Sequence, residues 1–507
     1  MNKMPVFNCK VSIVGFGLLI LTVSYFTYFQ GYDQPAAFFW DENYHVTHAQ
    51  KYLNGIFHMH EHPPLGKLLI ALGEKIFDAN QIDNQFTGTD YTAALPAEFS
   101  FTGYRFFSAL LSWFTAPVFF LILLVVTRHP LWSALLSCFY VFDNALIVHG
   151  RGAMLDGPLI FFVSTSILGF LLIHEWRYSR FRFGMSSFLF GVFFACAVTT
   201  KLVGLILLLL IPAILMRLPG IREGVRFLLF CGTGFVLTFF MVWQAHFSLG
   251  VSIHPDLRNN GYYEASENYR ALIETGVHTK IKVFPTAIVD SLKYPFEYDR
   301  GIPDLNLCKP DENGSPAWFW PFGGRSITYR WETPDGENFK YLQLISNPVS
   351  WILGTAAAFL GLSLLAISFF FGIGKKDRNL FLIATFSVLY FAFMLVLGQM
   401  GRVLFLYHYF PPLLFSFILF SLCFVRVTNL GPLQLGGTRK TIGAVAICAG
   451  VILAYSFFSP LTYFKPLTDL QFQKRALLDI WELRCARCPR HSWIATPRGS
   501  GEKFSKP

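Results

Sequence analysis

The chain has 507 residues, of which 53% are hydrophobic and only 14% are charged. Soluble proteins carry about 25% charged residues, so the composition excludes an ordinary soluble enzyme. The net charge of +10 is carried mostly in short segments between apolar runs. Basic residues in such positions are typical of membrane topology signals, so the charge does not indicate nucleic-acid binding.

Apolar runs of about 20 residues, the length that crosses a bilayer as a helix, recur along the whole chain. We predict eleven spans, at residues 11–29, 104–126, 131–149, 155–174, 185–200, 202–216, 226–244, 349–373, 379–398, 403–425 and 441–459. The pattern therefore predicts an all-α polytopic membrane protein.

The distribution of basic residues predicts the orientation of these spans, because short cytoplasmic loops are enriched in Lys and Arg. Placing the N-terminus in the cytoplasm puts most basic loop residues on that side. The chain then divides into an N-terminal catalytic membrane module with a first outer loop, a second outer loop, a C-terminal four-helix membrane block and an outer tail. These parts are residues 1–244 (loop 30–103), 245–348, 349–459 and 460–507.

The first outer loop contains the stretch FFWDENYHVTHAQKYLNGIFHMHEHPPLGK, residues 38–67. Two runs in and after it, HVTHAQKYLNGIF and PPLGKLLIALGEKIF, predict helices lying at the membrane surface. Asp41 and Glu42 come directly before the first of them. Such a pair is either solvated at the interface or acts as a general base or substrate ligand, and the sequence around it favours function.

Charged residues recur near the outer ends of the predicted spans. Taken singly, Arg105 could anchor a helix end, Arg151 and Asp156 could pair, and Lys201 could mark a tight turn. Together with Arg402 they form a ring of charge at one leaflet, and ionisable groups at membrane depth are usually functional. An anion site beside a carboxylate suits a lipid-linked sugar phosphate, whose leaving charge the cations would stabilise.

The histidines of the first loop leave two interpretations open. His58, His60 and His62, with Glu61 or Asp41, could bind a divalent metal ion. Their spacing matches neither a zinc signature nor one face of a helix, so we expect interfacial histidines, with His62 contacting substrate. Cys485 and Cys488 could form a disulfide or half of a metal site, or remain free thiols.

The first-loop stretch resembles the corresponding motif of protein O-mannosyltransferases, with its acidic pair, Lys-Tyr, and His-Pro-Pro-Leu followed by Lys. GYRFFSALL, RGAMLDGPLIFF, TTKLVGL and GRVLFLYHYFPPLLF match further family patterns in the same order, and so does WFWPFGGRSITYRW with YLQLISNPVSW. The resemblance covers nearly the whole chain.

This resemblance implies a C-type glycosyltransferase fold with about eleven transmembrane helices. It also implies a polyprenyl- or dolichyl-phosphate mannose donor, Ser/Thr hydroxyls of exported proteins as acceptors, inversion at the sugar carbon, and no cofactor or divalent metal. Asp41 would be the catalytic base and Glu42 a catalytic or organising residue, and Arg105 would contact the donor phosphate. The further expected substrate-binding residues are His62, Lys67, Arg151, Asp156, Lys201, Arg402 and His408.

The eukaryotic relatives carry a β-trefoil module in the second outer loop, and residues 245–348 are too few for one with its linkers. We therefore expect the bacterial branch and a bacterial plasma membrane, with the endoplasmic reticulum as the eukaryotic alternative. The eukaryotic relatives form dimers, and the resemblance extends this expectation to the present chain. Two rival functions remain: glycosyl transfer to lipid A or another glycan, and transport of lipid-linked sugars. A transporter would place polar groups and broken helices at the midplane, and Asp143 and Asn144 are the residues that fit this rival.

Overall fold

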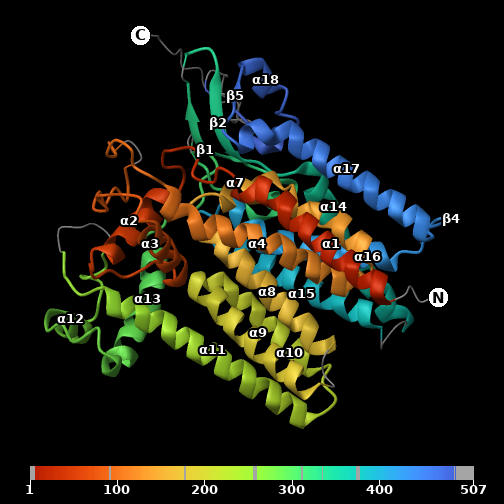
Figure 1. Ribbon diagram of the computed structural model, residues 1–507, viewed down its shortest axis with the longest axis horizontal. Helices are drawn as coiled ribbons and strands as arrows, with labels where there is room; N and C mark the ends of the chain where they lie inside the picture. The colour runs from red at the N-terminus through yellow and green to blue at the C-terminus, as the bar shows by residue number, and fades with distance from the viewer. Residues whose placement is uncertain are drawn as a thin grey trace.

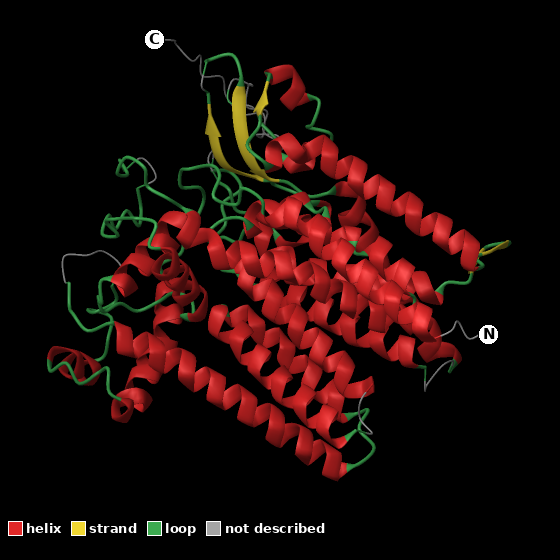
Figure 2. Cartoon of the chain, in the orientation of Figure 1, coloured by secondary structure: helices red, strands yellow, loops and turns green. Residues whose placement is uncertain are grey.

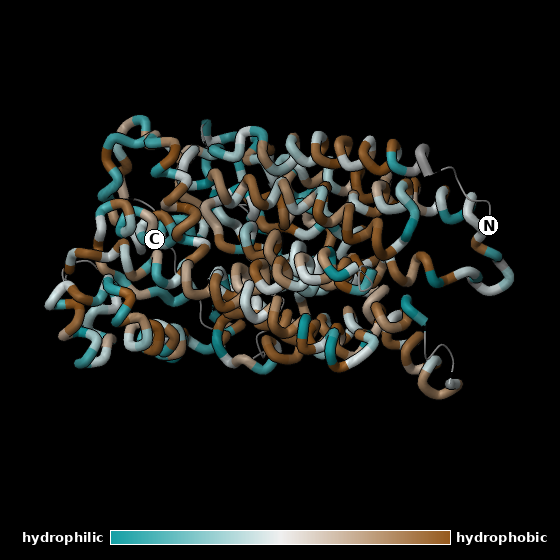
Figure 3. The backbone as a smooth tube through the Cα atoms, turned by 60° about the horizontal axis from the view of Figure 1, so that its bottom comes forward, coloured by the Kyte–Doolittle hydropathy of each residue, from teal (hydrophilic) through white to brown (hydrophobic). Residues whose placement is uncertain are grey.

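The computed structural model describes residues 6–90, 93–175, 179–254, 260–309, 312–333, 335–372, 377–484 and 486. Long helices lie side by side, and most of the shorter helices and a small sheet gather at one end of them (Figures 1 and 2). Hydrophobic residues are concentrated along the long helices, as Figure 3 shows. The predicted Cys485 and Cys488 motif lies outside the described residues.

Nine helical segments in the described part of the chain are long and apolar enough to cross a membrane. They are α1 (Val6–Ser24) continued by η1 (Tyr25–Phe29), α4 (Thr102–Thr127), α8 (Asp156–Glu175), α9 (Arg180–Thr200), α11 (Ile221–Leu249), α14 (Pro348–Phe371), α15 (Arg378–Gly398), η5 (Leu406–Tyr409) with α16 (Phe410–Arg426), and α17 (Gly437–Thr462). Their positions agree with nine of the eleven predicted spans.

The other two predicted spans depart from long straight helices. Nine helical segments of the described residues, or ten if the bent pair counts as one span, have the length and apolarity of a spanning helix. The third is broken into α5 (Pro130–Leu136), α6 (Cys138–Val141) and α7 (Asn144–Gly150), with a 62° bend before α7. The sixth is η2 (Leu202–Leu209) followed by α10 (Leu210–Leu215). A 3₁₀ helix rises about 2.0 Å per residue, against about 1.5 Å for an α-helix. Residues 202–215 are therefore about 25 Å long, longer than an α-helix of the same number of residues.

Asp143 stabilises the bend through contacts that include distant residues. Its carboxylate accepts hydrogen bonds from Leu146 N (3.0 Å), Trp351 Nε1 (2.7 Å) and the Ser350 hydroxyl (3.2 Å). These contacts cap α7 and fasten it to α14. Asp143 therefore marks a helix end, and its hydrogen bonds are structural.

The outer end of the molecule is built from shorter elements. They are α2 (Glu42–Leu53), α3 (Leu65–Phe77), α12 (Glu267–Glu274), η3 (Ile281–Val283), α13 (Phe284–Arg300), η4 (Ala317–Phe322), β1 (Ile327–Glu332), β2 (Phe339–Leu344), β5 (Pro466–Leu467), α18 (Asp469–Gln473) and η6 (Asp479–Trp481). The helices predicted after Asp41 and after Pro64 are confirmed as α2 and α3. At the opposite end, β3 (Asn429–Leu430) pairs with β4 (Leu433–Gln434).

A three-stranded antiparallel sheet, in the order β1-β2-β5, was not predicted. β2 packs against α7 and α17 (Figure 1). The sheet joins the second outer loop to the residues after α17, so it closes the outer end over the helices. One consequence is that Tyr329, on β1, reaches the candidate site described below.

Close packing of α9 against α11 depends on Gly191. A Cβ atom on Gly191 would lie 2.0 Å from the backbone oxygen of Cys231, where no side chain can move aside. Small residues allow membrane helices to approach closely in this way. We expect Gly191→Ala to lower the stability of the detergent-purified protein by about 1–3 kcal/mol, the usual cost of overpacking.

The matched control is Gly232→Ala on α11, where nothing lies within 4 Å of the new Cβ. Alanine also has a higher helix propensity than glycine, by about 1 kcal/mol. Thermal unfolding followed by tryptophan fluorescence should therefore show a lower midpoint for Gly191→Ala and an unchanged or higher one for Gly232→Ala. Equal midpoints would contradict the packing argument.

Candidate active site

Asp41 lies at the outer end of the molecule, immediately before α2. It occupies the N-cap position, but its carboxylate makes no capping hydrogen bond. The preceding Trp40 has a φ of 50°, a left-handed conformation that costs energy for a bulky residue. The Trp40 ring stacks on Tyr329 and meets the edge of Phe405. The chain is thus held in a strained turn that aims the Asp41 carboxylate away from its own helix.

The Asp41 carboxylate is partly exposed and accepts a hydrogen bond of 3.3 Å from the Tyr407 hydroxyl. Burial by the surrounding protein raises the pKa of Asp41 to about 6, while Lys201 and the Tyr407 hydroxyl pull it down. Asp156 and Glu61 add smaller upward contributions to this pKa. Among the described residues, one oxygen of Asp41 is therefore free of hydrogen bonds, and the pKa of the carboxyl lies near neutral pH.

Glu42 has a different environment from its neighbour. It is fully buried and forms a two-point ion pair with Arg105, at 2.6 Å from Nε to Oε1 and 2.8 Å from Nη2 to Oε2. The backbone N–H groups of Ala153 and Phe39 donate to the same two oxygens. Both oxygens are thus occupied, so Glu42 organises the turn around Asp41 and has no oxygen free for an incoming proton.

Arg105 also differs from its expected role. Besides Glu42, its Nη1 and Nη2 atoms donate to the carbonyl oxygens of Asp33, Pro35 and Ala37 at 2.7–2.8 Å. All five N–H donors of the guanidinium are therefore used inside the protein, and its side chain is fully buried. The expected contact with the donor phosphate is corrected to a positioning role, because no donor remains for a phosphate.

Asp156 and Lys201 come together as expected for charged groups at one surface. Lys201 Nζ lies 2.7 Å from Asp156 Oδ2, and His149 Nε2 lies 2.9 Å from the same oxygen. Nδ1 of His149 is 2.5 Å from the Tyr329 hydroxyl. The rings of His149 and Tyr407 stack, which connects this group to the residue that holds Asp41.

Arg402 provides a further cation near the site. It forms a 3.5 Å ion pair with Asp299, and its Nε is buried without a hydrogen-bond partner among the described residues. Its charge acts on His408, which stacks against Trp320 and Tyr407. Arg402 therefore retains donor capacity at its Nε, and its charge reaches the site through His408.

His62 and Lys67 lie on another side of the site. Lys67 forms an ion pair with Glu61 and is fully buried. Burial, followed by the charge of Lys201, lowers the pKa of His62 to about 3, so its imidazole is neutral. The charges of Lys201, Lys67, Glu61 and Asp156 all act on the pKa of His62, so both ion pairs influence this residue.

The sequence left open that Arg151 pairs with Asp156. The structure shows other partners for Arg151. Its guanidinium donates to the carbonyl oxygens of Thr27 and Gln30 at 3.3 and 2.9 Å and to that of Gly31 at 2.5 Å. The same group lies over the ring of Tyr463. Arg151 thus fastens the end of the first span to the end of α17 and supports the site from behind.

Several residues of this site were not singled out from the sequence. Tyr407 and His408 belong to the FLYHYFPP stretch, but only the histidine was named. His149 precedes Arg151 in HGRGAMLDG, and Tyr329 belongs to the unpredicted strand β1. Tyr407 and Tyr329 lie in stretches that match family patterns, FLYHYFPP and WFWPFGGRSITYRW, and His149 comes two residues before RGAMLDGPLIFF. Their place in or beside these motifs was the available signal.

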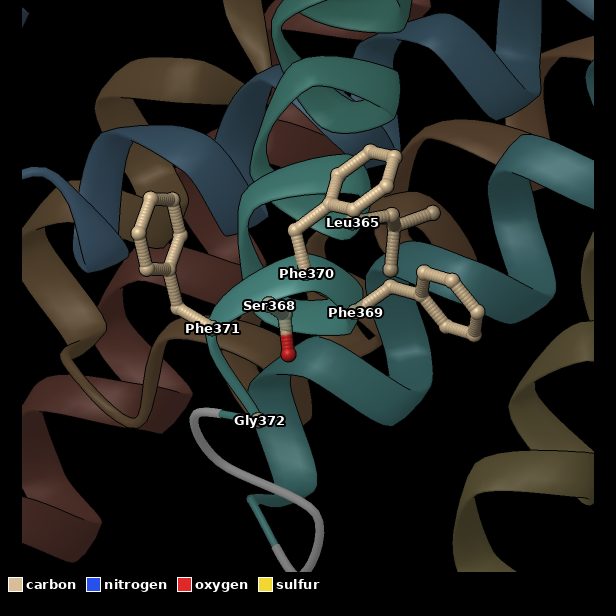
Figure 4. A pocket seen from close by; sticks show the side chains of 6 residues that line it. All are labelled: Leu365, Ser368, Phe369, Phe370, Phe371 and Gly372. Carbon is tan, nitrogen blue, oxygen red and sulfur yellow. The ribbon is translucent and has the colours of Figure 1, made fainter.

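The hollow drawn in Figure 4 lies away from this site. It is formed at the end of α14 by Leu365, Ser368 and three successive phenylalanines, Phe369, Phe370 and Phe371. All three phenylalanine side chains are strongly exposed. Asn347, at the start of α14, contacts α17 and the bend before α7, so the hollow and that contact are at opposite ends of the helix. Exposed aromatic side chains on a spanning helix suit contact with lipid.

Comparison with protein families matches two parts of the chain. The family described as dolichyl-phosphate-mannose-protein mannosyltransferase matches residues 18–248. The C-terminal four TMM region of protein-O-mannosyltransferase matches residues 303–481. Together they include α2, the bent span, Lys201, β1 and Tyr407, so all the residues predicted for the site lie in a matched region.

Individual relatives agree with this result over part of their length. Protein O-mannosyltransferase 1 of Drosophila pseudoobscura pseudoobscura is 27% identical over 213 residues, 42% of this chain and 23% of the relative. Dolichyl-phosphate-mannose–protein mannosyltransferase 4 of Schizosaccharomyces pombe is 30% identical over 191 residues, 37% of this chain and 24% of the relative. The chain spans about a quarter of the length of these curated relatives.

Solved structures share the fold. The S. cerevisiae protein O-mannosyltransferase Pmt1-Pmt2 complex bound to the sugar donor superposes with a TM-score of 0.71 at 14% identity, covering 94% of this chain and 93% of the other. The archaeal oligosaccharyltransferase AglB from Archaeoglobus fulgidus gives 0.52 at 9% identity, over 93% and 58% of the two chains. With this C-type glycosyltransferase fold and both matched regions, the chain is a multi-pass membrane protein that belongs to the protein O-mannosyltransferase family.

Proposed function

We propose that this protein transfers mannose from a polyprenyl- or dolichyl-phosphate mannose to Ser/Thr hydroxyls of exported proteins at the outer face of the membrane. The observation that carries the proposal is the Asp41 carboxylate, held beside the Asp156–Lys201 pair by Tyr407. Family membership supports the sugar and the acceptor class, and the position of the site at the outer end of the helices supports the side of the membrane.

In the proposed reaction Asp41 acts as general base. The acceptor hydroxyl attacks C1 of mannose and gives its proton to Asp41, while the bond from C1 to the phosphate oxygen breaks. The polyprenyl phosphate leaves with the bonding electron pair. A single displacement of this kind inverts the configuration at C1. A base with a pKa of about 6 suits this task, because it is mostly deprotonated at neutral pH and still accepts a proton readily.

The leaving phosphate needs positive charge, and we propose that Lys201 and Arg402 supply it. Lys201 is held by Asp156 and approaches the face of Tyr407, the residue that contacts Asp41. Arg402 offers its buried Nε, which has no hydrogen-bond partner in the part of the chain that the structure describes. His62, Lys67 and His408 complete the proposed surroundings of the substrate. With cationic side chains in this place, the proposed transfer needs no metal ion at the phosphate.

We further propose that the protein lies in a bacterial plasma membrane. We also propose that it forms a dimer with a second chain of the same family. The segment between α11 and α14 folds as short helices and the β1-β2 hairpin, a compact cover over the outer end.

The proposal for acceptors can be tested by mass spectrometry of exported proteins from cells with and without the gene. Loss of hexose from Ser/Thr sites on exported proteins would support it. Loss confined to lipid A or another glycan would move the function to that acceptor.

The pKa of Asp41 predicts a pH profile. A general base works in its deprotonated form, so kcat/KM should be constant at neutral pH and fall as the pH drops through about 6. The measurement is the initial rate of mannosyl transfer between pH 5 and 8 with purified enzyme. A rate that stays constant down to pH 5 would indicate an ordinary aspartate pKa of about 3.9 and would contradict this environment for Asp41.

Lys201→Met tests whether the charge of Lys201 helps to set the pH at which kcat/KM falls, the acidic limb of the profile. The charge of Lys201 lowers the pKa of Asp41, so its removal should raise this pKa and shift the limb to higher pH, besides lowering the rate. Lys280→Met, at an exposed position of the second outer loop, is the matched control and should keep the wild-type limb. A limb that is the same in both variants would exclude an electrostatic link between Lys201 and Asp41.

A further inference from the structure

Four histidine rings gather around Tyr52, beside the proposed catalytic site. His48 comes from α2, His58 and His60 from the extended segment after it, and His246 from α11. The rings of His48, His58 and His60 lie 4.6–5.3 Å apart between centroids. All are almost completely buried. The proposed transfer reaction does not use this cluster.

Three of these rings present a nitrogen without a hydrogen-bond partner among the described residues: Nε2 of His48, Nε2 of His58 and Nδ1 of His60. In His48 the other nitrogen lies 2.8 Å from the Tyr44 carbonyl, and in His58 it lies 2.8 Å from the Ile56 carbonyl. A carbonyl can only accept, so Nδ1 carries the hydrogen in both rings and a neutral ring then has a lone pair on Nε2. Metal-binding histidines are oriented by this kind of contact.

His60 can present a lone pair in the same way. Its Nε2 lies 2.6 Å from the Tyr52 hydroxyl, which also lies 2.8 Å from His246 Nδ1. When the hydroxyl donates to His246, His60 Nε2 donates to the hydroxyl and the lone pair is on His60 Nδ1. Buried nitrogens with no partner cost free energy, and a ligand that accepts their electron pairs removes this cost.

Glu61 adds a carboxylate to the same place. One of its oxygens pairs with Lys67, and the other, Oε2, lies 3.9 Å from His48 Nε2. One ligand atom each from His48, His60 and Glu61 lie within 4.8 Å of one another. In a tetrahedral zinc site, bonds of about 2.0–2.1 Å put ligand atoms about 3.4 Å apart. Small side-chain rotations would therefore bring these atoms to bonding distance.

We propose that His48, His60 and Glu61 bind one divalent transition-metal ion of the zinc type, with His58 as the fourth side chain. Three imidazoles and a carboxylate are ligands that such an ion prefers, and they suit a tetrahedral arrangement. The ion would fasten the segment carrying His58 and His60 to α2. The charges of Lys51 and Lys67 act on these histidines, so the negative charge of Glu61 is required to hold a dication here.

The test uses the full-length protein in detergent, treated with chelator and titrated with Co²⁺. Tetrahedral Co²⁺ with nitrogen and oxygen ligands gives visible absorption much stronger than octahedral Co²⁺. We expect one tightly bound Co²⁺ per chain in the wild type, displaced by Zn²⁺, and a binding constant at least tenfold weaker in His48→Gln and His60→Gln. His254→Gln, an exposed histidine of the second outer loop, is the matched control and should bind as the wild type does.

Co²⁺ binding is compared only for variants that elute from size-exclusion chromatography at the wild-type volume. If a histidine variant fails this criterion, Glu61→Gln takes its place. No tetrahedral Co²⁺ signal in the wild type would overturn the proposal, and so would unchanged binding in the folded variants of His48, His60 or Glu61. These readouts do not involve mannose transfer. Failure of the metal site and failure of the proposed function are therefore distinguishable.

Discussion

Asp41→Asn is expected to lower kcat for mannosyl transfer by about 10²–10⁴-fold, the usual contribution of a general base. The asparagine side chain has the same shape and can still contact the Tyr407 hydroxyl, but it cannot accept the proton of the acceptor. Because the Asp41 carboxylate makes no capping bond to α2, the substitution should leave the fold intact. The rate is measured with saturating donor and peptide, so that kcat and KM are separated.

The matched control is Asp78→Asn, in the same outer loop at the end of α3. Asp78 is exposed and has a left-handed conformation with φ of 49°, which asparagine accepts well. Asp78→Asn should retain wild-type activity. A rate for Asp41→Asn within a few-fold of the wild type, in protein with a wild-type unfolding midpoint, would remove Asp41 from the proposed mechanism.

The second large effect concerns the buried ion pair of Glu42 and Arg105. Removing one partner leaves a charge buried without its counter-ion, which costs about 3–5 kcal/mol. Arg105→Met should therefore lower the unfolding midpoint strongly or prevent purification, because it also frees the carbonyl oxygens of Asp33, Pro35 and Ala37. Thermal unfolding of the purified variants measures this effect.

Glu42→Gln combined with Arg105→Met completes a double-mutant cycle. The double variant removes both charges, so it should be less destabilised than the sum of the two single variants. A role of Arg105 at the donor phosphate makes a different prediction: Arg105→Met would keep its stability and raise the KM for the lipid donor alone. That result would contradict the positioning role that its hydrogen bonds indicate.

Hydropathy was sufficient to predict where the helices lie, because a segment that crosses a bilayer must be long and apolar. It did not show that two of the predicted spans are bent or tightened. The bend depends on Asp143 meeting Ser350 and Trp351, more than 200 residues away in sequence, and η2 depends on packing beside α9. Neither of these contacts is visible in a local apolar pattern.

In the candidate site, too, some residues could be predicted from the sequence, but their partners could not. Asp41, Glu42, Asp156 and Lys201 were found because charged residues are rare in such a sequence and stand out. Their partners could not be predicted, since Glu42 and Arg105 are 63 residues apart and Asp156 and Lys201 are 45 residues apart. For the same reason Arg105 was expected at a phosphate, although its donors are all used by the turn before Asp41.

The histidines illustrate the limit of spacing as a signal for metal binding. His58, His60 and His62 alternate along the chain, and this spacing matched no zinc signature. In the fold, the charge of Lys201 acts on His62, while the ring of His48 from α2 contacts those of His58 and His60. A cluster drawn from two elements has no fixed sequence spacing, so only the three-dimensional arrangement brings its ligands together.

The most direct test of the proposed function is transfer of mannose by the purified wild-type protein. Polyprenyl-phosphate mannose carrying a radiolabel is incubated with the enzyme and a Ser/Thr-rich peptide, and the peptide is isolated and analysed. We predict label on Ser or Thr with inverted configuration at C1, and none from the Asp41→Asn variant. A folded wild-type enzyme that consumes the donor onto a lipid or glycan, and leaves the peptide unlabelled, would contradict transfer to protein.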